Sequence, residues 1–336
     1  MKKFLALVLC INVLLLSSCG NSLNEVNETT EEVTDFTDFN SENTSVPDAS
    51  PLEEITEDFT DNSVNAENSD RSFYGKNTGT DLTVTGFEPL VKADFHWEKR
   101  ADFDKLATKA ISHSYGVAAQ EKPHNISIDA QKFFDEKNFD AICYDSKTSQ
   151  KVLYLTFDCG YENGCTEMIL DVLKEKNVSA AFFCTLPQMR DNREIISRMI
   201  KEGHIVGNHS VTHPDFSTLS DSKIVDELNG FDDYIRQEFG YSALYFRFPE
   251  GKYSEKSLSV INSLGYKCVF WSLAYADWDI NNQKGASYAL ETVMSRIHPG
   301  AVILLHAVSP DNANALASII DACHSMGYEF RSLESL

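Results

Sequence analysis

The sequence predicts an α/β protein whose core is a distorted (β/α) barrel of about seven parallel strands, preceded by an N-terminal extension. From residue 151 onward, apolar runs of strand length alternate with longer stretches of helical period, a pattern typical of parallel strands joined by crossover helices. The chain has 336 residues, of which 42% are hydrophobic, and this suffices for a barrel. An open doubly wound sheet shows the same alternation and stays an alternative.

Seven apolar runs of strand length are expected to form the sheet: residues 152–157, 180–186, 205–208, 244–248, 267–273, 301–305 and 328–332. Six segments of helical period are expected between them: residues 165–176, 193–202, 221–239, 255–264, 288–297 and 312–326. No GxGxxG or phosphate-binding loop follows the first strand, which argues against a nucleotide-binding fold.

The region before the barrel is less regular, and we assign residues 72–150 to an extension that packs on the domain formed by residues 151–336. Apolar residues recur at helical spacing in residues 102–111, where a helix is expected. A second helix is expected at residues 129–135.

The first 19 residues are typical of a bacterial lipoprotein signal peptide. Lys2 and Lys3 precede an almost wholly apolar stretch, residues 4–16, and the sequence Leu-Ser-Ser-Cys then ends at Cys19. This sequence resembles a lipobox, in which Cys19 becomes the lipidated first residue and anchors the protein to the outer side of the cell membrane. An ordinary secretory signal with a chance cysteine is the alternative.

Residues 20–71 are expected to form a disordered acidic linker. Residues 20–70 contain 15 Asp or Glu and no Lys or Arg, so charge repulsion and weak burial both oppose folding. The whole chain carries a formal charge of −22, which makes nucleic acid an improbable partner because phosphate binding recruits basic surfaces. The six cysteines beyond the signal have no framework spacing, and most are expected to be buried free thiols.

Polar motifs follow the carboxyl ends of five predicted strands, where folds of this class place their active sites. They are TFDCGYEN (156–163), NHSVTHP (208–214), RFPEG (247–251), DW (277–278) and LH (305–306). Each motif alone is a weak signal, whereas five at the same end of one sheet indicate a site.

The residue types in these motifs favour hydrolysis assisted by a metal ion. His209 and His213 are spaced i, i+4, which points two imidazoles the same way on one helical turn and suits a divalent metal. Asp158 follows a strand directly and is a candidate general base on a metal-bound water. Arg247 is expected to hold Asp158 through a bidentate pair. The structural alternatives are hydrogen-bonded loop histidines, a helix-capping aspartate and a surface salt bridge.

His306 also follows a strand and is a candidate proton donor to a leaving amine, with a core histidine as the alternative. Asp277 is placed to orient its ring, as carboxylates commonly orient catalytic imidazoles.

Together, TFDxGYEN, NHSxTHP, RFPxGxYSE, WSLAYADW and LLHAVSPDNANAL resemble the polysaccharide deacetylases of the NodB-homology family over roughly residues 145–336. The resemblance is greatest to the delta-lactam-biosynthetic de-N-acetylases, which act on N-acetylmuramic acid in spore-cortex peptidoglycan. It implies that Asp158 is the base, that Arg247 orients this base, and that His306 is the acid. It further implies that Asp277 tunes His306 and that His209 and His213 are metal ligands. It also implies a set of substrate-binding residues, namely Tyr161, Glu162, Asn163, Glu250, Gly251, Trp278 and Leu304.

One position departs from the family pattern. The wider family has an Asp metal ligand directly after the base, where this chain has Cys159. A thiolate binds zinc, so Cys159 is a candidate third ligand. A two-histidine site completed by water is the alternative. The implied cofactor is a divalent metal, zinc or another first-row ion.

The expected function is therefore removal of acetyl groups from N-acetylmuramic acid in peptidoglycan by a lipid-anchored, monomeric enzyme. Within the same chemistry, the alternative substrate is N-acetylglucosamine of peptidoglycan or another glycan. A lipid-anchored glycan-binding protein without catalysis is the alternative of a different class. Cys159 supports this non-catalytic alternative. The presence of both a candidate base and a candidate acid argues against it, because a binding protein needs neither.

Overall fold

The structure is a computed structural model that describes residue 90 and residues 97–336. The expected signal peptide (1–19) and acidic linker (20–71) lie outside the described residues. Within the described part of the chain, no helix combines the length and apolar character needed to cross a membrane.

A curled sheet of eight strands forms the core, and every pairing within it is parallel. The long strand β3 (Val152–Cys159) lies between β9 (Ala301–His306) and β4 (Ala181–Cys184). Beyond β4 follow β5 (Ile205–Asn208), β6 (Tyr245–Phe246), β8 (Lys267–Val269) and β2 (Ala141–Ile142), while β10 (Glu329–Phe330) pairs with the start of β3.

The two ends of the sheet meet just after β8. A parallel bridge joins Leu273 to Ile303 of β9, and the Leu304 amide donates to the Leu273 carbonyl at 2.9 Å. Because β9 already pairs with β3, this contact closes the sheet on itself. The predicted distorted barrel is confirmed, and the open doubly wound alternative is wrong.

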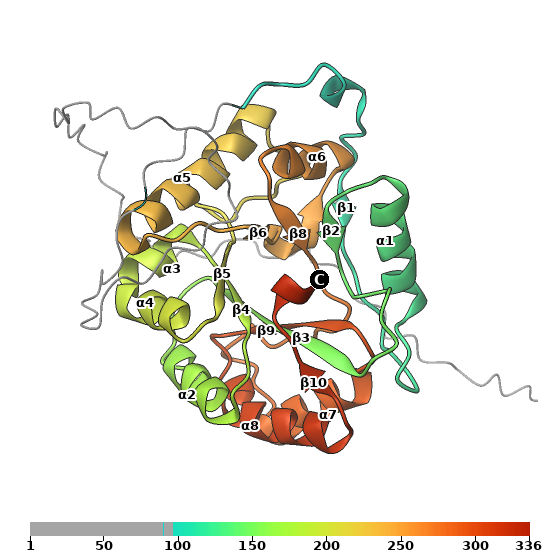
Figure 1. Cartoon of the computed structure of the whole chain (residues 1–336), viewed down its shortest axis with the longest axis vertical. Helices are drawn as coiled ribbons and strands as arrows, with labels where there is room; N and C mark the ends of the chain where they lie inside the picture. The colour runs from blue at the N-terminus through green and yellow to red at the C-terminus, as the bar shows by residue number, and fades with distance from the viewer. Residues whose placement is uncertain (1–89, 91–96) are drawn as a thin grey trace, which may run out of the picture. The chain divides into compact units, whose positions relative to one another are not determined.

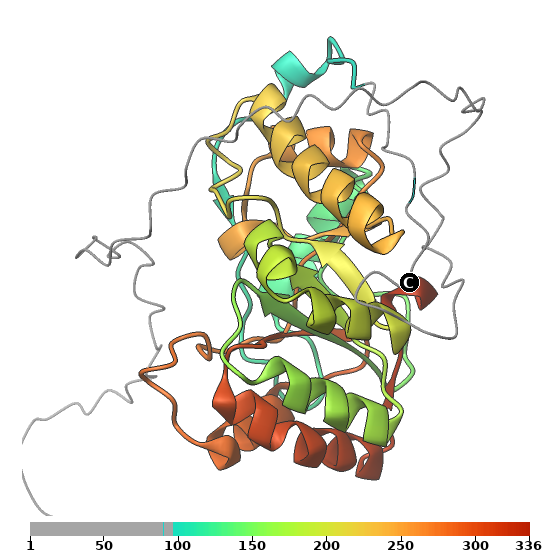
Figure 2. The same ribbon diagram turned by 90° about the vertical axis from the view of Figure 1, so that its left-hand side faces the viewer.

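Seven helices surround the sheet among the described residues that follow β3 (Figures 1 and 2). They are α2 (Thr166–Lys176), α3 (Leu186–Asp191), α4 (Arg193–Lys201), α5 (Asp221–Phe239), α6 (Glu255–Ser263), α7 (Ala286–Arg296) and α8 (Pro310–Ser325). The six helices predicted for this region are confirmed. The short α3 was not predicted. It begins where Thr185 caps the Gln188 amide, at the end of an apolar run whose pattern indicates a strand.

The extension before β3 contains one of its two predicted helices. Helix α1 (Asn125–Glu136) contains the predicted helix at 129–135 and starts earlier, where the His124 ring accepts the Ile126 amide. The predicted helix at 102–111 is wrong, because only the 3₁₀ turn η1 (Phe103–Lys105) forms there. After it the chain extends into β1 (Ile111–Ser112), which pairs antiparallel with β7 (Lys252–Tyr253). Pairing with β7 and burial of Phe103 outweigh the helical periodicity.

Both faces of β3 are buried, but they carry different kinds of side chain. Phe157 stacks on Phe182 of β4, on the face of the sheet opposite to Asp158. The inner face of β3 carries Thr156 and Asp158, so the polar side chains are concentrated inside the barrel at its carboxyl end.

The six cysteines in the described region are buried and free of disulfides, as predicted.

Candidate active site

Asp158 stands at the carboxyl end of β3 and is 8% exposed. Its Oδ1 accepts a hydrogen bond from Arg247 Nη1 at 2.8 Å, and its Oδ2 lies 3.6 Å from His209 Nε2. Burial alone would raise the pKa of Asp158, but the charge of the Arg247 guanidinium holds this pKa below its ordinary value. The carboxylate therefore stays ionised at neutral pH, with Oδ2 directed toward the histidines.

Arg247 is fully buried, and protein acceptors surround it. Its Nε donates to the Val269 carbonyl, and its Nη2 donates to Thr156 Oγ1 at 2.8 Å and to the Phe270 carbonyl. Only Nη1 reaches Asp158, so the predicted bidentate pair is wrong. The guanidinium divides its donors between the carboxylate and the ends of β3 and β8. It thereby fixes Asp158 more firmly than one ion pair would.

His209 and His213 are brought together by an irregular loop. Their ring centroids lie 4.9 Å apart at an interplanar angle of 78°. The predicted helical turn is wrong, because Ser210 and His213 adopt left-handed backbone angles, with φ of 75° and 57°. Local hydrogen bonds replace the helical pattern. The Ser210 amide donates to Asn208 Oδ1 and the His213 amide to Ser210 Oγ.

The ring of His209 is suited to ligate a metal. Its Nδ1 hydrogen-bonds the Arg247 carbonyl at 2.8 Å, which assigns the proton to Nδ1 and leaves the Nε2 lone pair free on the side of Asp158. Burial lowers the pKa of His209 to about 4, so the ring is neutral. His213 is exposed beside it. The two histidines and the Asp158 carboxylate are nitrogen and oxygen donors of the kind that zinc and its neighbours bind.

Cys159 is turned away from this cluster. Its side chain projects from the opposite face of β3 to Asp158, in register with Cys184 of β4. It is fully buried there. Burial and the neighbouring Cys184 raise the pKa of the Cys159 thiol well above its ordinary value. Among the described residues, no three His, Cys, Asp or Glu side chains cluster closely enough to hold a metal by themselves.

On the other side of Asp158, His306 ends β9. Its Nδ1 lies 2.7 Å from Asp277 Oδ1, and its backbone amide donates to Asp277 Oδ2 at 2.8 Å. Asn312 Nδ2 also donates to Asp277 Oδ2, at 2.5 Å. Burial alone would lower the pKa of His306, but the Asp277 carboxylate raises it above its ordinary value. His306 thus keeps a proton more readily than a free histidine, as a general acid requires.

Two of the predicted substrate-binding residues form exposed aromatic surface. Tyr161 is 50% exposed and Trp278 is 43% exposed, and the Trp278 ring centroid lies 5.8 Å from that of His306. Amphipathic rings at the mouth of a site suit contact with sugar faces. Leu304 lies two residues before His306 on the same side of β9, where it is buried.

The remaining predicted substrate-binding residues also have contacts within the protein. Glu162 Oε1 accepts the Thr166 amide at the start of α2, and Asn163 Nδ2 donates to the Val308 carbonyl. Glu250 pairs with Lys252 at 2.7 Å.

Gly251 has a φ of 65°, and a β-carbon there would lie 2.9 Å from the Trp271 ring, so this turn requires glycine. The carbonyl of Gly251 accepts the His113 amide from the extension.

Sequence reasoning missed two residues of this network. Thr156 links Arg247 to the Ile303 carbonyl, and Asn312 holds Asp277. Both lie inside motifs that the sequence singled out, and both are fully buried. A polar residue in an apolar strand, such as Thr156, was the available signal.

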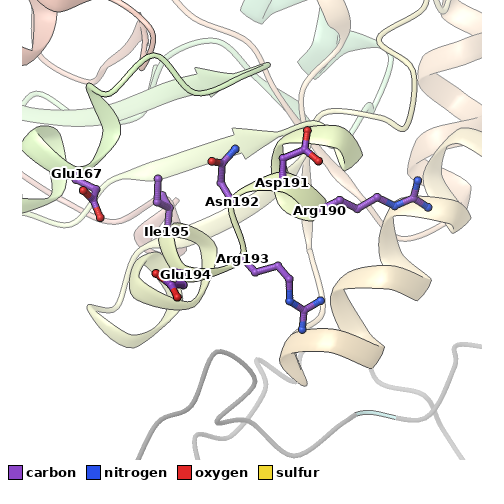
Figure 3. A pocket seen from close by; sticks show the side chains of 7 residues that line it. All are labelled: Glu167, Arg190, Asp191, Asn192, Arg193, Glu194 and Ile195. Carbon is purple, nitrogen blue, oxygen red and sulfur yellow. The ribbon is translucent and has the colours of Figure 1, made fainter. Parts of the chain in front are cut away.

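A pocket elsewhere on the described surface is lined from α2 to α4 by side chains of both charges, shown in Figure 3: Glu167, Arg190, Asp191, Asn192, Arg193, Glu194 and Ile195. Arg193 pairs with Glu238. None of the predicted site residues lines this pocket.

Comparison with known proteins agrees with this geometry. Residues 145–269 match the polysaccharide deacetylase family. The chain is 46% identical over 201 residues to peptidoglycan-N-acetylmuramic acid deacetylase PdaA of Bacillus subtilis (strain 168). This alignment covers 60% of this chain and 76% of that protein. The chain belongs to the polysaccharide deacetylase family.

Solved structures of the family are also similar. The structure of Bacillus subtilis PdaA, a family 4 carbohydrate esterase, superposes with a TM-score of 0.66 at 40% identity and covers 69% of this chain and 98% of that one. A family 4 carbohydrate esterase from Bacillus anthracis gives a TM-score of 0.56 at 39% identity, with 69% and 97% covered. The polysaccharide deacetylase domain is thus a hydrolase domain, as predicted.

Proposed function

We propose that this polysaccharide deacetylase removes the acetyl group from N-acetylmuramic acid in peptidoglycan, toward formation of muramic delta-lactam. The observation that carries the proposal is the placement of an ionised carboxylate, Asp158, and an imidazole with raised pKa, His306, at adjacent strand ends beside two histidines. Base, acid and metal ligands in one site are what hydrolysis of an amide needs. The muramic substrate follows from the similarity to PdaA.

The residues divide the reaction between them. Asp158 Oδ2 accepts a proton from the attacking water, since Oδ1 is engaged by Arg247. His306 donates a proton from Nε2 to the leaving amine, while its Nδ1 faces Asp277. The amide C–N bond breaks, acetate is released, and the free amine remains on the sugar. A divalent metal held by His209 and His213 would polarise the acetyl carbonyl and lower the pKa of water.

The direct test is to incubate the protein with peptidoglycan, measure released acetate, and identify the deacetylated sugar by mass spectrometry. Deacetylated muramic acid is expected. Deacetylated glucosamine would move the proposal to the other amino sugar. Absence of acetate from a folded, zinc-loaded protein would favour a glycan-binding role.

Asp277→Asn is expected to shift the alkaline limb of the activity profile to lower pH. The carboxylate raises the pKa of His306, so its removal leaves burial to lower that pKa. A general acid works only while protonated, so activity is then lost at a lower pH than in the wild type. Turnover measured between about pH 5 and pH 10 checks this around the ordinary histidine pKa. Asp279→Asn, an exposed neighbour, is the control, and an unshifted profile in Asp277→Asn would contradict the role.

Cys159→Ala is expected to leave zinc affinity and turnover close to wild type. Its thiol faces Cys184 and resists ionisation because it is buried, and only a thiolate is a good zinc ligand. Competition with a chelator measures the affinity, and Cys184→Ala is the matched control. A large loss confined to Cys159→Ala would make Cys159 the third ligand.

We further propose that Cys19 carries a lipid that holds the protein to the outer face of the membrane, with residues 20–71 as an extended tether. The support is the Leu-Ser-Ser-Cys sequence and the acidic composition that follows it. Cys19→Ala should release the protein from the membrane fraction or leave an unprocessed precursor. A variant that fractionates and migrates like wild type would refute the anchor.

A further inference from the structure

The loop that carries His209 and His213 needs external support. Two of its residues, Ser210 and His213, hold left-handed backbone angles that residues with a β-carbon adopt infrequently. Such angles persist where surrounding contacts over-determine the conformation. The bonds from Asn208 and Ser210 fix the two ends of the loop, but they leave the amides of Val211 and Thr212 in the middle unaccounted for.

Glu227 of α5 accepts both of these amides. Its Oε2 lies 2.9 Å from the Val211 nitrogen and 2.8 Å from the Thr212 nitrogen. Its Oε1 accepts the Thr212 hydroxyl at 2.6 Å. A single carboxylate therefore binds three donors of the segment between the two histidines. Charge-assisted bonds of this kind are stronger than bonds between neutral groups.

The helix approaches the loop closely around this contact. Gly230 lies three residues after Glu227 on the same side of α5, and a β-carbon there would come within 2.9 Å of Val211 Cγ2. Asn208 Nδ2 donates to the Leu228 carbonyl of the same helix. Glycine is unfavourable inside a helix, so its place here fits the need for close packing. Within the described part of the chain, no Lys or Arg forms an ion pair with Glu227. A surface salt bridge therefore does not account for the position of the Glu227 side chain.

We infer that Glu227 is a positioning residue that holds the His209–His213 loop in its metal-binding conformation, acting through the backbone and touching neither metal nor substrate. This inference rests on the proposed function, because it takes the two histidines to be metal ligands. In other metal sites, carboxylates that do not touch the metal hold its ligands in place, and their loss commonly weakens metal affinity by about 10–100-fold. Glu227 of α5 would have a comparable role here.

The test measures zinc affinity of the full chain by competition with a chelator, together with amide hydrogen exchange of the metal-free protein. Glu227→Ala is expected to weaken zinc binding about tenfold or more and to speed exchange at Val211 and Thr212. Glu227→Gln should weaken zinc binding less than Glu227→Ala, because its one oxygen still accepts both amides and its NH₂ can donate to the Thr212 hydroxyl, although without the charge. Asp226→Ala, which removes an exposed carboxylate paired with Lys223, is the control and should change neither quantity.

Wild-type zinc affinity in Glu227→Ala, or an equal loss in Glu227→Gln, would overturn the inference. Should Glu227→Ala fail to fold, Glu227→Asp takes its place: it keeps the charge but withdraws the carboxylate by one methylene, and it should also weaken zinc binding. His209→Ala tests the metal site itself, separately from the role of Glu227. If it abolishes zinc binding and Glu227→Ala does not weaken it, only the role of Glu227 fails. If His209→Ala binds zinc normally, the metal site fails and the role of Glu227 with it.

Discussion

Asp158→Asn is expected to lower turnover by about 10²–10⁴-fold, the usual contribution of a general base. The amide has nearly the same shape as the carboxylate but cannot accept the proton of the attacking water. Its carbonyl oxygen can still accept Arg247 Nη1, so the position of the side chain is retained. Turnover on peptidoglycan, measured on zinc-loaded protein, checks the loss.

Two controls separate loss of the base from loss of the fold. Arg247 is fully buried and loses its counter-charge in Asp158→Asn, which is costly for a buried ion, so the melting temperature must be measured alongside turnover. Asp171 is an exposed residue of α2 that pairs with Arg198, and Asp171→Asn should lose no activity. If Asp158→Asn kept turnover within a fewfold of wild type, the base would have to be another group.

His209→Ala and His213→Ala are each expected to abolish stoichiometric binding of a divalent metal and, with it, activity. Each substitution removes the imidazole of one of two rings whose centroids lie 4.9 Å apart, and the described residues contain no group of three candidate ligands that could replace it. Zinc content after chelation and re-addition, measured with turnover, tests both variants.

His324→Ala provides the control, because His324 is exposed on α8 and is not part of the candidate site. The clearest contrary result would be full activity in wild-type protein shown to be free of metal. Asp158 and His306 would then have to act without a Lewis acid.

The sequence was sufficient for the barrel and for the composition of the site. Apolar runs ended in polar residues at Asp158, Asn208, Arg247 and His306, and parallel strands bring their carboxyl ends to one edge of a sheet. The pairing of His306 with Asp277 was also predictable, since each follows a strand and the two chemistries complement each other.

Finer details depended on tertiary contacts that a local pattern does not contain. The spacing of His209 and His213 suggested a helical turn, whereas Ser210 and His213 have left-handed angles in a loop that bonds to Asn208 and Glu227. The donors of Arg247 were known from its residue type, but which of them reach Asp158 and which reach Thr156 depends on how the closed barrel places Arg247, which follows β6, against β3. Cys159 was ambiguous because its direction depends on whether β3 continues through it, and β3 does.

The position of β9 has a consequence for biosynthesis. Residues 301–306 lie between β3 and the segment around Leu273, so the barrel cannot close until nearly the whole chain has been made and exported. Until then, one edge of β3 exposes unpaired backbone groups, a surface prone to aggregation, and Asp277 waits for His306. A chain interrupted before residue 301 would therefore lack both the strand that closes the barrel and His306.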